Sequence, residues 1–119
     1  MTTENTVIYH NPRCSKSRET LQILEEHHLQ PEIIEYLEDP PTPQELKRLI
    51  AILGVSAREL LRTTEPVYKE ADLDDDSLDE DEIIEAICEY PELMQRPIVV
   101  CGNRAVIGRP PVRVLDIIA

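Results

Sequence analysis

The chain has 119 residues, of which 41% are hydrophobic and 30% charged, a composition typical of one small globular domain. Its formal net charge of −12 argues against a nucleic-acid-binding surface, which needs a basic patch. No apolar run approaches the ~20 residues of a membrane span, and residues 1–6 lack a signal-peptide pattern. We therefore expect a cytoplasmic protein that does not act on membranes.

The cysteine and histidine content indicates free thiols and no metal site. Three cysteines are an odd number without a repeating spacing, which argues against a disulfide framework. In a reducing cytosol they should remain thiols. The chain has only three histidines and no Cys-x-x-Cys or His-x-x-x-His pair, so we expect neither a metal nor a bound cofactor.

The first third of the chain predicts a strand, a helix and a second strand. Residues 7–9 are β-prone and stop at Asn11-Pro12. A helical pattern begins at Ser15 and fades near residues 27–28, and residues 32–37 follow as a strand. A unit of this kind implies two parallel strands joined by the helix.

The middle of the chain predicts a helical insertion over about residues 40–91. Two capping-box patterns, "TPQE" and "SARE", each mark the start of a helix, and Gly54 marks the end of the first one. The strongly acidic run at 70–82 is interpreted as a solvated loop followed by an acidic first helical turn. The expected helices cover residues 43–53, 57–62, 67–71 and 79–89.

The last part of the chain predicts a hairpin and a closing helix. Residues 98–101 and 104–107 are strand-like, and Gly102-Asn103 between them is a two-residue turn signal. Pro110-Pro111 then opens a helix, with Val112, Leu115 and Ile118 as its expected buried side. The element order predicts one α/β domain over residues 1–119, with a small mixed sheet.

Cys14 is the candidate nucleophile. It follows a strand and a Pro corner at the point where a helix begins, and helix N-termini expose N–H groups that stabilise anions. Arg13, Lys16 and Arg18 place positive charge nearby. A free thiol is only about 3% ionised at pH 7, and a pKa roughly two units lower makes it mostly thiolate. The pattern favours a reactive thiolate over a small residue at a turn.

The other cysteines do not share these features. Cys88 lies among apolar helix positions and Cys101 ends a strand, so both are interpreted as structural. Ser17 occupies the position that a second cysteine holds in Cys-x-x-Cys motifs. A mixed disulfide at Cys14 would therefore need an external thiol to resolve it.

Five segments, taken together, resemble the glutathione/glutaredoxin-dependent arsenate reductase family. They span nearly the whole chain in the family's order. They are "YHNPRCSKSR", "YLEDPP", "ARELLR", "RPIVV" and "IGRPP". The resemblance implies a thioredoxin-like fold with a helical insertion.

The resemblance also implies the site residues and the reaction. The family's nucleophile falls on Cys14, assisted by His10 and Ser17. Its arsenate-binding arginines fall on Arg62, Arg96 and Arg109, and its cis-proline falls on Pro97. The implied substrate is arsenate or a similar oxyanion, with glutathione as co-substrate and glutaredoxin as partner. The other arginines are interpreted as surface charges; these are Arg48, Arg58, Arg104 and Arg113.

Two alternatives remain open. Ser15-Lys16 stand where established family members usually carry Gly-Thr, which motivates a glutathione-dependent thiol reductase without arsenate preference. A non-enzymatic regulator resembling the Spx family, which shares the fold and binds RNA polymerase, is the other alternative. Ser17 replaces the second cysteine of the Cys-x-x-Cys switch that such regulators usually carry.

Overall fold

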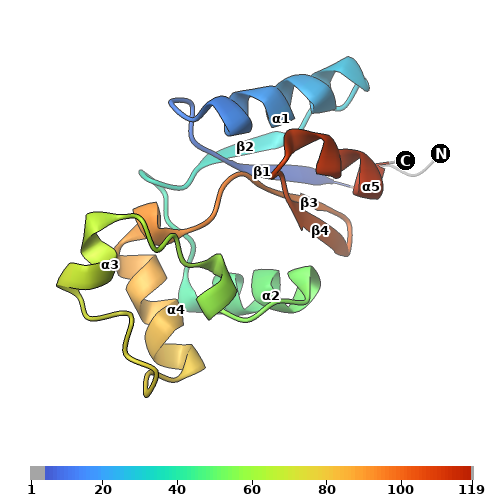
Figure 1. Cartoon of the computed structure of the whole chain (residues 1–119). Coiled ribbons are helices and arrows are strands. Elements are labelled where there is room, and N and C mark those ends of the chain that lie inside the picture. The colour runs from blue at the N-terminus through green and yellow to red at the C-terminus, as the bar shows by residue number, and fades with distance from the viewer. Residues whose placement is uncertain (1–4, 119) are drawn as a thin grey trace. The chain divides into compact units, whose positions relative to one another are not determined.

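The computed structural model describes residues 5–118 (Figure 1). These residues form two compact units. The first contains the chain up to Asp39 together with the segment from Arg96 onward, and the second contains Pro40–Gln95. We refer to them as the sheet unit and the helical unit and describe each separately. Between residues 5 and 118, no helix is long and apolar enough to cross a membrane.

The sheet unit contains a four-stranded mixed sheet, as predicted. Its strand order is β2-β1-β3-β4, with β1 parallel to β2 and the other neighbours antiparallel. The hairpin falls on the expected residues. The strands are β1 (Thr6–His10), β2 (Glu32–Glu35), β3 (Ile98–Cys101) and β4 (Arg104–Ile107).

Strand β2 is two residues shorter than predicted. The carbonyl oxygen of Glu35 accepts hydrogen bonds from the N–H groups of Glu38 (3.0 Å) and Asp39 (2.9 Å), which closes a turn. The apolar residues Tyr36 and Leu37 therefore belong to this turn. Tyr36 is fully buried, whereas Leu37 is 43% exposed.

Helices α1 (Ser15–Glu26) and α5 (Leu115–Ile118) cover one face of the sheet (Figure 1). Leu24 of α1 and Ile117 of α5 pack into one buried cluster with residues of β1, β3 and β4. Burying such aliphatic side chains contributes roughly 1.5–3 kcal/mol each. The residues that the strands contribute to this cluster are Ile8, Val99, Cys101 and Val106.

The predicted buried face of the last helix is wrong at Val112, whereas Ile118 is partly buried against the cluster. The segment begins as a 3₁₀-helix, η3 (Pro111–Val114), and continues as α5. A 3₁₀-helix has three residues per turn, so side chains three apart share a face. The predicted set, which starts at Val112, and the observed set both have this spacing. The buried set starts one residue earlier and consists of Pro111, Val114 and Ile117, whereas Val112 is 54% exposed.

The helical unit follows the predicted capping signals. Thr42 and Glu45 form a reciprocal capping box at the start of α2, and Gly54 ends this helix with a left-handed φ of 71°. Asp79 and Glu82 form a further box, not predicted from the sequence, at the start of α4, which packs against α2. The helices are α2 (Pro43–Leu53), η1 (Arg58–Leu60), α3 (Pro66–Glu70), α4 (Glu80–Glu89) and η2 (Pro91–Leu93).

Candidate active site

One edge of the sheet gathers the ends of all four strands. The pairing places His10 beside Glu35, and Ile98 beside Tyr9 and Ile107. The segments that follow β1, β2 and β4 and the segment that precedes β3 therefore meet at this edge. Cys14, Arg96 and Arg109 lie on these segments.

Asn11 organises the loop that carries Cys14. Its side-chain Oδ1 accepts a hydrogen bond from the N–H of Arg13 (3.0 Å), a turn that Asn side chains commonly form. Its carbonyl oxygen accepts from the N–H of Cys14 (3.0 Å), and its own N–H donates to Oγ of Ser17 (3.0 Å). Asn11 is buried, and these bonds hold Cys14 at the N-cap position of α1.

The pKa of the Cys14 thiol lies below its ordinary value. Partial burial raises this pKa, but hydrogen bonds to the sulfur outweigh the burial. The donors are the N–H of Ser17, the guanidinium of Arg96 and the N–H of Lys16, and the charge of Arg96 adds to their effect. A thiolate at this position is a better nucleophile than a thiol.

The source of the positive charge differs from the sequence-based interpretation. Arg13, Lys16 and Arg18 are the cations nearest in sequence, yet Arg96 supplies the guanidinium that interacts with Cys14. The guanidinium of Arg18 instead donates to the carbonyl oxygen of Pro12 (2.9 Å). Only the backbone N–H of Lys16 contributes to the thiolate.

Arg96 and Arg109 are neighbours. Nε of Arg109 donates to the carbonyl oxygen of Arg96 (2.8 Å). Nε of Arg96 is buried and has no hydrogen-bond partner among residues 5–118, so this donor remains available to an anion. The Arg96–Pro97 peptide bond is cis, and so is the Arg109–Pro110 bond.

His10 and Ser17 form a buried pair behind the loop. Nδ1 of His10 lies 2.6 Å from Oγ of Ser17, whose side chain is fully buried. Burial lowers the pKa of His10; the carboxylate of Glu35 opposes this shift, and Arg18 adds to it. A neutral imidazole can accept the Ser17 hydroxyl proton at Nδ1. The hydroxyl of Ser17 thus hydrogen-bonds to His10, while the backbone N–H of Ser17 hydrogen-bonds to the sulfur of Cys14.

We expect the imidazole of His10 to titrate below pH 6.5. The Glu35→Gln substitution should lower its pKa further because it removes a negative charge, and Arg18→Gln should raise it. Because the folded-state pKa is depressed, the stabilising contribution of neutral His10 is complete above about pH 6.5 and is lost as the pH falls. NMR titration of the imidazole carbons measures these shifts. A midpoint above 6.5 would contradict the prediction.

Gly108 packs between α1 and the segment that precedes β3. A Cβ atom at this position would lie 2.7 Å from Oγ1 of Thr20 and 2.9 Å from Cγ of Pro97. Oγ1 of Thr20 donates to the carbonyl oxygen of Lys16 (2.8 Å), and the N–H of Gly108 donates to the carbonyl oxygen of Pro97 (2.9 Å). The absence of a side chain at Gly108 therefore lets β4 lead directly into Arg109.

Gly108→Ala is expected to destabilise the fold by about 1–3 kcal/mol, the usual cost of overpacking a buried site. Urea unfolding measures the loss. The double variant Gly108→Ala/Thr20→Ala should recover part of it, because it removes Oγ1 and Cγ2 of Thr20 but leaves the contact with Pro97. Wild-type stability in the single variant would show that the neighbours move aside at no cost.

Cys88 and Cys101 have different surroundings from Cys14. Burial raises the pKa of the Cys88 thiol, and the carboxylates of Glu45 and Glu85 raise it further. Cys101 is buried, and Oγ1 of Thr6 donates to its sulfur at 3.7 Å. All three cysteines are free thiols.

Arg62, the third arginine implied by the resemblance, lies in the helical unit. Its N–H donates to the carbonyl oxygen of Leu93 (2.7 Å), next to an isolated bridge between Leu61 and Met94. Its Nε lies 3.6 Å from the Glu65 carboxylate, an ion pair too long to count as a hydrogen bond. Nε is buried and without a hydrogen-bond partner in the described part of the chain.

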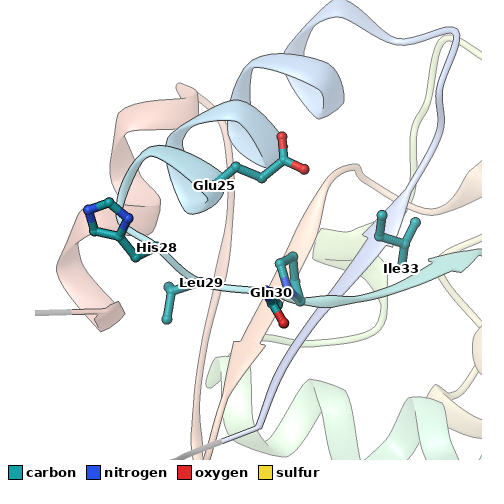
Figure 2. A pocket seen from close by; sticks show the side chains of 6 residues that line it. Glu25, His28, Leu29, Gln30 and Ile33 are labelled. Carbon is teal, nitrogen blue, oxygen red and sulfur yellow. The ribbon is translucent and has the colours of Figure 1, made fainter.

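Two cavities of the sheet unit lie at opposite ends of β2. Figure 2 shows the larger one, of about 500 Å³, at the C-terminal end of α1. It is lined by Glu25, His28, Leu29, Gln30, Pro31 and Ile33. The smaller one, of about 290 Å³, adjoins the Cys14 loop and is lined by residues 10–13, Glu35, Leu37 and Glu38. Residues 5–118 contain no group of three or more His, Cys, Asp or Glu side chains able to hold a metal.

The family model of the ArsC family matches residues 9–117. The chain belongs to the ArsC family. It is 46% identical to an arsenate reductase of Neisseria meningitidis over 104 residues, which cover 87% of this chain and 89% of the relative. It is 53% identical to the uncharacterized protein YfgD of Escherichia coli K12 over 117 residues, 98% of each chain.

Solved structures of this family share the fold. An arsenate reductase from Vibrio cholerae superposes with a TM-score of 0.95 at 48% identity, covering 98% of this chain and 100% of that one. The predicted thioredoxin-like fold with a helical insertion is thereby confirmed. That residues 1–119 form one domain stays a prediction.

Two residues of the site were not identified from the sequence. The Asn-Pro pair predicted a corner but not the three hydrogen bonds of Asn11 that place Cys14. Tyr36, assigned to a strand, lies in the turn after β2 and is fully buried there, and it interacts electrostatically with the guanidinium of Arg96. No local sequence signal reports this interaction between distant segments of the chain.

Proposed function

We propose that the protein reduces arsenate to arsenite, with Cys14 as nucleophile, glutathione as electron donor and glutaredoxin as the partner that removes glutathione. The observation that carries the proposal is the contact between the Arg96 guanidinium and the Cys14 thiol at the N-terminus of α1. The names of the arsenate reductases at 42–46% identity support arsenate as the substrate.

The arginines offset the electrostatic repulsion between the thiolate and arsenate. A thiolate that attacks arsenate brings two negative charges together, so cationic donors must hold the anion first. In the proposal, Arg96, Arg109 and Arg62 bind oxygens of arsenate, as the resemblance to the family implies. The Nε donors of Arg96 and Arg62, which are buried without a hydrogen-bond partner among residues 5–118, support these roles.

The proposed reaction conserves atoms and electrons. Sγ of Cys14 bonds to As(V), and one oxygen of arsenate leaves as water after protonation. Glutathione then condenses onto the arsenic with loss of a second water. A glutaredoxin thiolate attacks the glutathione sulfur, the S–As bond breaks, and its electron pair reduces arsenic to As(III). Hydrolysis releases arsenite from Cys14, so one arsenate and two thiols give arsenite, a disulfide and water.

The need for outside thiols follows from Ser17, which cannot form a disulfide with Cys14. A second thiol from solution must therefore complete the electron pair. Glutathione and glutaredoxin are abundant in a reducing compartment, and we accordingly place the reaction in the cytoplasm.

A coupled assay tests the proposed function. Arsenate, glutathione, glutaredoxin and glutathione reductase should together produce arsenate-dependent oxidation of NADPH. No such oxidation with any donor would overturn the function. Turnover with thioredoxin and thioredoxin reductase alone would retain arsenate but overturn the donor.

Ser15-Lys16 beside Cys14 favours a second candidate, a thiol reductase without arsenate preference. Its signature would be reduction of a glutathione mixed disulfide at a rate that Arg62→Ala leaves unchanged. Arsenate reduction, in contrast, should fall in the Arg62→Ala variant.

A further inference from the structure

We propose that the cavity beside the Cys14 loop binds the γ-glutamyl end of glutathione, whose carboxylate and ammonium groups are recognised from its two sides. We call it the loop cavity. It has a volume of about 290 Å³ and is lined by residues 10–13, Glu35, Leu37 and Glu38. The identity of the ligand rests on the proposed function, whereas the arrangement of polar groups around the cavity does not depend on it.

Two buried polar side chains line the loop cavity. His10 is only 6% exposed and Asn11 only 8%. Among residues 5–118, the Asn11 carboxamide makes a single hydrogen bond, which its Oδ1 accepts from the N–H of Arg13 (3.0 Å). A backbone N–H only donates, so the atom that faces it is the oxygen, and Nδ2 keeps both of its donors. Buried donors need a partner, and a ligand in the loop cavity would provide one.

His10 adds a further donor to the same wall. Oγ of Ser17 accepts a hydrogen bond from the N–H of Asn11 (3.0 Å) and lies 2.6 Å from Nδ1 of His10. The hydroxyl proton is therefore available to Nδ1, and the neutral imidazole then carries its own proton on Nε2. With the guanidinium of Arg13, this wall combines N–H donors and one positive charge, the groups that recognise a carboxylate.

The opposite wall carries negative charge. Glu35 and Glu38 are both exposed, and the hydrogen bond from the N–H of Glu38 to the carbonyl oxygen of Glu35 (3.0 Å) holds them in one turn. The salt bridges formed among residues 5–118 lie in the helical unit. These two carboxylates are therefore able to accept an ammonium group. Leu37 lies between them in sequence and is 43% exposed, which offers an apolar contact.

Donors on one wall and carboxylates on the other match the head of an amino acid, in which ammonium and carboxylate share one carbon. The γ-glutamyl end of glutathione carries this head and two methylene groups that can contact Leu37. The volume of about 290 Å³ is near the lower end of small-molecule sites, roughly 300–1,000 Å³, so the loop cavity accommodates this end rather than the whole tripeptide.

The position of the loop cavity favours glutathione over a free amino acid. Arg13 directly precedes Cys14, and consecutive Cα atoms are only about 3.8 Å apart. An extended tripeptide spans about 10 Å, so glutathione anchored at Arg13 can bring its thiol to Cys14. A free amino acid has the same head but no thiol to deliver.

Thiol exchange with oxidised glutathione tests the site without arsenate. The Cys14 thiolate attacks one sulfur of the disulfide, a Cys14–glutathione disulfide forms, and the second glutathione leaves as a thiolate with the electron pair. The reagent 2-hydroxyethyl disulfide undergoes the same exchange but has no amino-acid head. The ratio of the two rate constants therefore measures recognition of the head, because a change in the reactivity of Cys14 affects both rates.

Glu38→Gln should lower this ratio about threefold to tenfold, because an ammonium group loses its charged partner. General electrostatics predicts the opposite, since oxidised glutathione is an anion and the variant removes a negative charge. Glu25→Gln is the matched control. It removes the same charge from the larger cavity at the other end of β2 (Figure 2) and should not lower the ratio. An unchanged or higher ratio in Glu38→Gln, or an equal fall in Glu25→Gln, would overturn the proposal.

Binding of S-methylglutathione, which cannot react with Cys14, tests the donor wall. In an NMR titration the side-chain N–H signals of Asn11 should shift, and Arg13→Gln should weaken binding about threefold to tenfold. Asn11 signals that stay unchanged at the glutathione concentration of the coupled assay would overturn the site. Glutamate that binds as tightly as S-methylglutathione would show a site for free amino acids and overturn the assignment to glutathione.

Failure of the site and failure of the proposed function are distinguishable. If the wild-type protein does not reduce arsenate, the function is overturned, while the exchange ratio and the titration still decide whether the loop cavity binds glutathione. If it does reduce arsenate, Glu38→Gln should raise KM for glutathione by about the factor by which it lowers the exchange ratio. An unchanged KM would retain the function and overturn the site.

Discussion

Cys14→Ser should lower kcat/KM for arsenate reduction on the order of 10³-fold or more, to the background of the coupled assay. A serine hydroxyl is hardly ionised at neutral pH, so the N–H groups and the guanidinium that stabilise a thiolate have no anion to act on. The variant should also lose the rapidly alkylated thiol at pH 6. Both losses follow from the surroundings of Cys14, whose pKa lies below the ordinary value.

Cys88→Ser and Cys101→Ser are the matched controls. Burial and two carboxylates raise the pKa of Cys88, which keeps it a thiol. Cys101 contributes to the buried cluster of the sheet unit, and serine there can still accept the hydrogen bond from Thr6. Each control should retain arsenate reduction within about threefold, with a loss of stability for Cys101→Ser. Loss of activity in Cys88→Ser, or activity that survives in Cys14→Ser, would contradict the assignment.

Local signals predicted most of the fold. The turn Gly102-Asn103 set the register of the hairpin, because a two-residue loop leaves few ways to pair its strands. The "TPQE" capping box predicted where α2 begins, because such a box is a pair of reciprocal hydrogen bonds between residues three apart. Such features depend on neighbouring residues alone.

The failures arose where tertiary structure overrides local pattern. Residues 36–37 continue the apolar run of β2, yet the chain turns there because the Glu35 carbonyl accepts two N–H groups. The expected face of the last helix was misplaced by one residue, because a spacing of three fits both the set that starts at Val112 and the buried set that starts at Pro111. Neither the turn nor the tighter helix has a distinct residue pattern in this chain.

The candidate site likewise contains residues that local sequence predicts and residues that it does not. Cys14, His10 and Ser17 lie within eight residues of one another, and the strand-to-helix junction that joins them can be predicted from the sequence. Residues that act on them from other strands cannot be predicted from local sequence. The charge that interacts with Cys14 was attributed to sequence neighbours, although Arg96 supplies it from the segment before β3. Resemblance to a family identified Arg96, but its interaction with the Cys14 thiol became visible only in the structure.

Arg96 therefore has two separable roles in the proposed reaction, to bind the arsenate oxyanion and to stabilise the Cys14 thiolate. Its removal should affect both. Arg96→Ala is expected to reduce kcat/KM for arsenate by about 10²- to 10³-fold, the range for losing one donor to a developing anion. It should also raise the pKa of Cys14, because the guanidinium stabilises the thiolate. Thiolate-dependent alkylation at pH 6 should fall, whereas at pH 10 it should approach the wild-type rate.

Phosphate distinguishes the anion-binding role from the effect on the thiol. As an unreactive tetrahedral oxyanion, it should compete with arsenate in the wild-type protein and slow alkylation of Cys14 by occupying the same donors. Protection by phosphate should be lost in Arg96→Ala even at pH 10, where the thiol is ionised in both proteins. If protection persists, the oxyanion binds elsewhere and Arg96 acts on the thiol alone.

Arg104→Ala provides the matched control, because Arg104 is an exposed arginine of β4 in the same sheet unit. It removes an equal charge and should change kcat/KM by less than about twofold, as expected for a solvated surface cation. A large loss in this variant would mean that net charge, rather than the guanidinium beside Cys14, governs the approach of the anion. The contrast between Arg96 and Arg104 thus tests whether a specific contact or the general field of an acidic protein with a net charge of −12 controls the reaction.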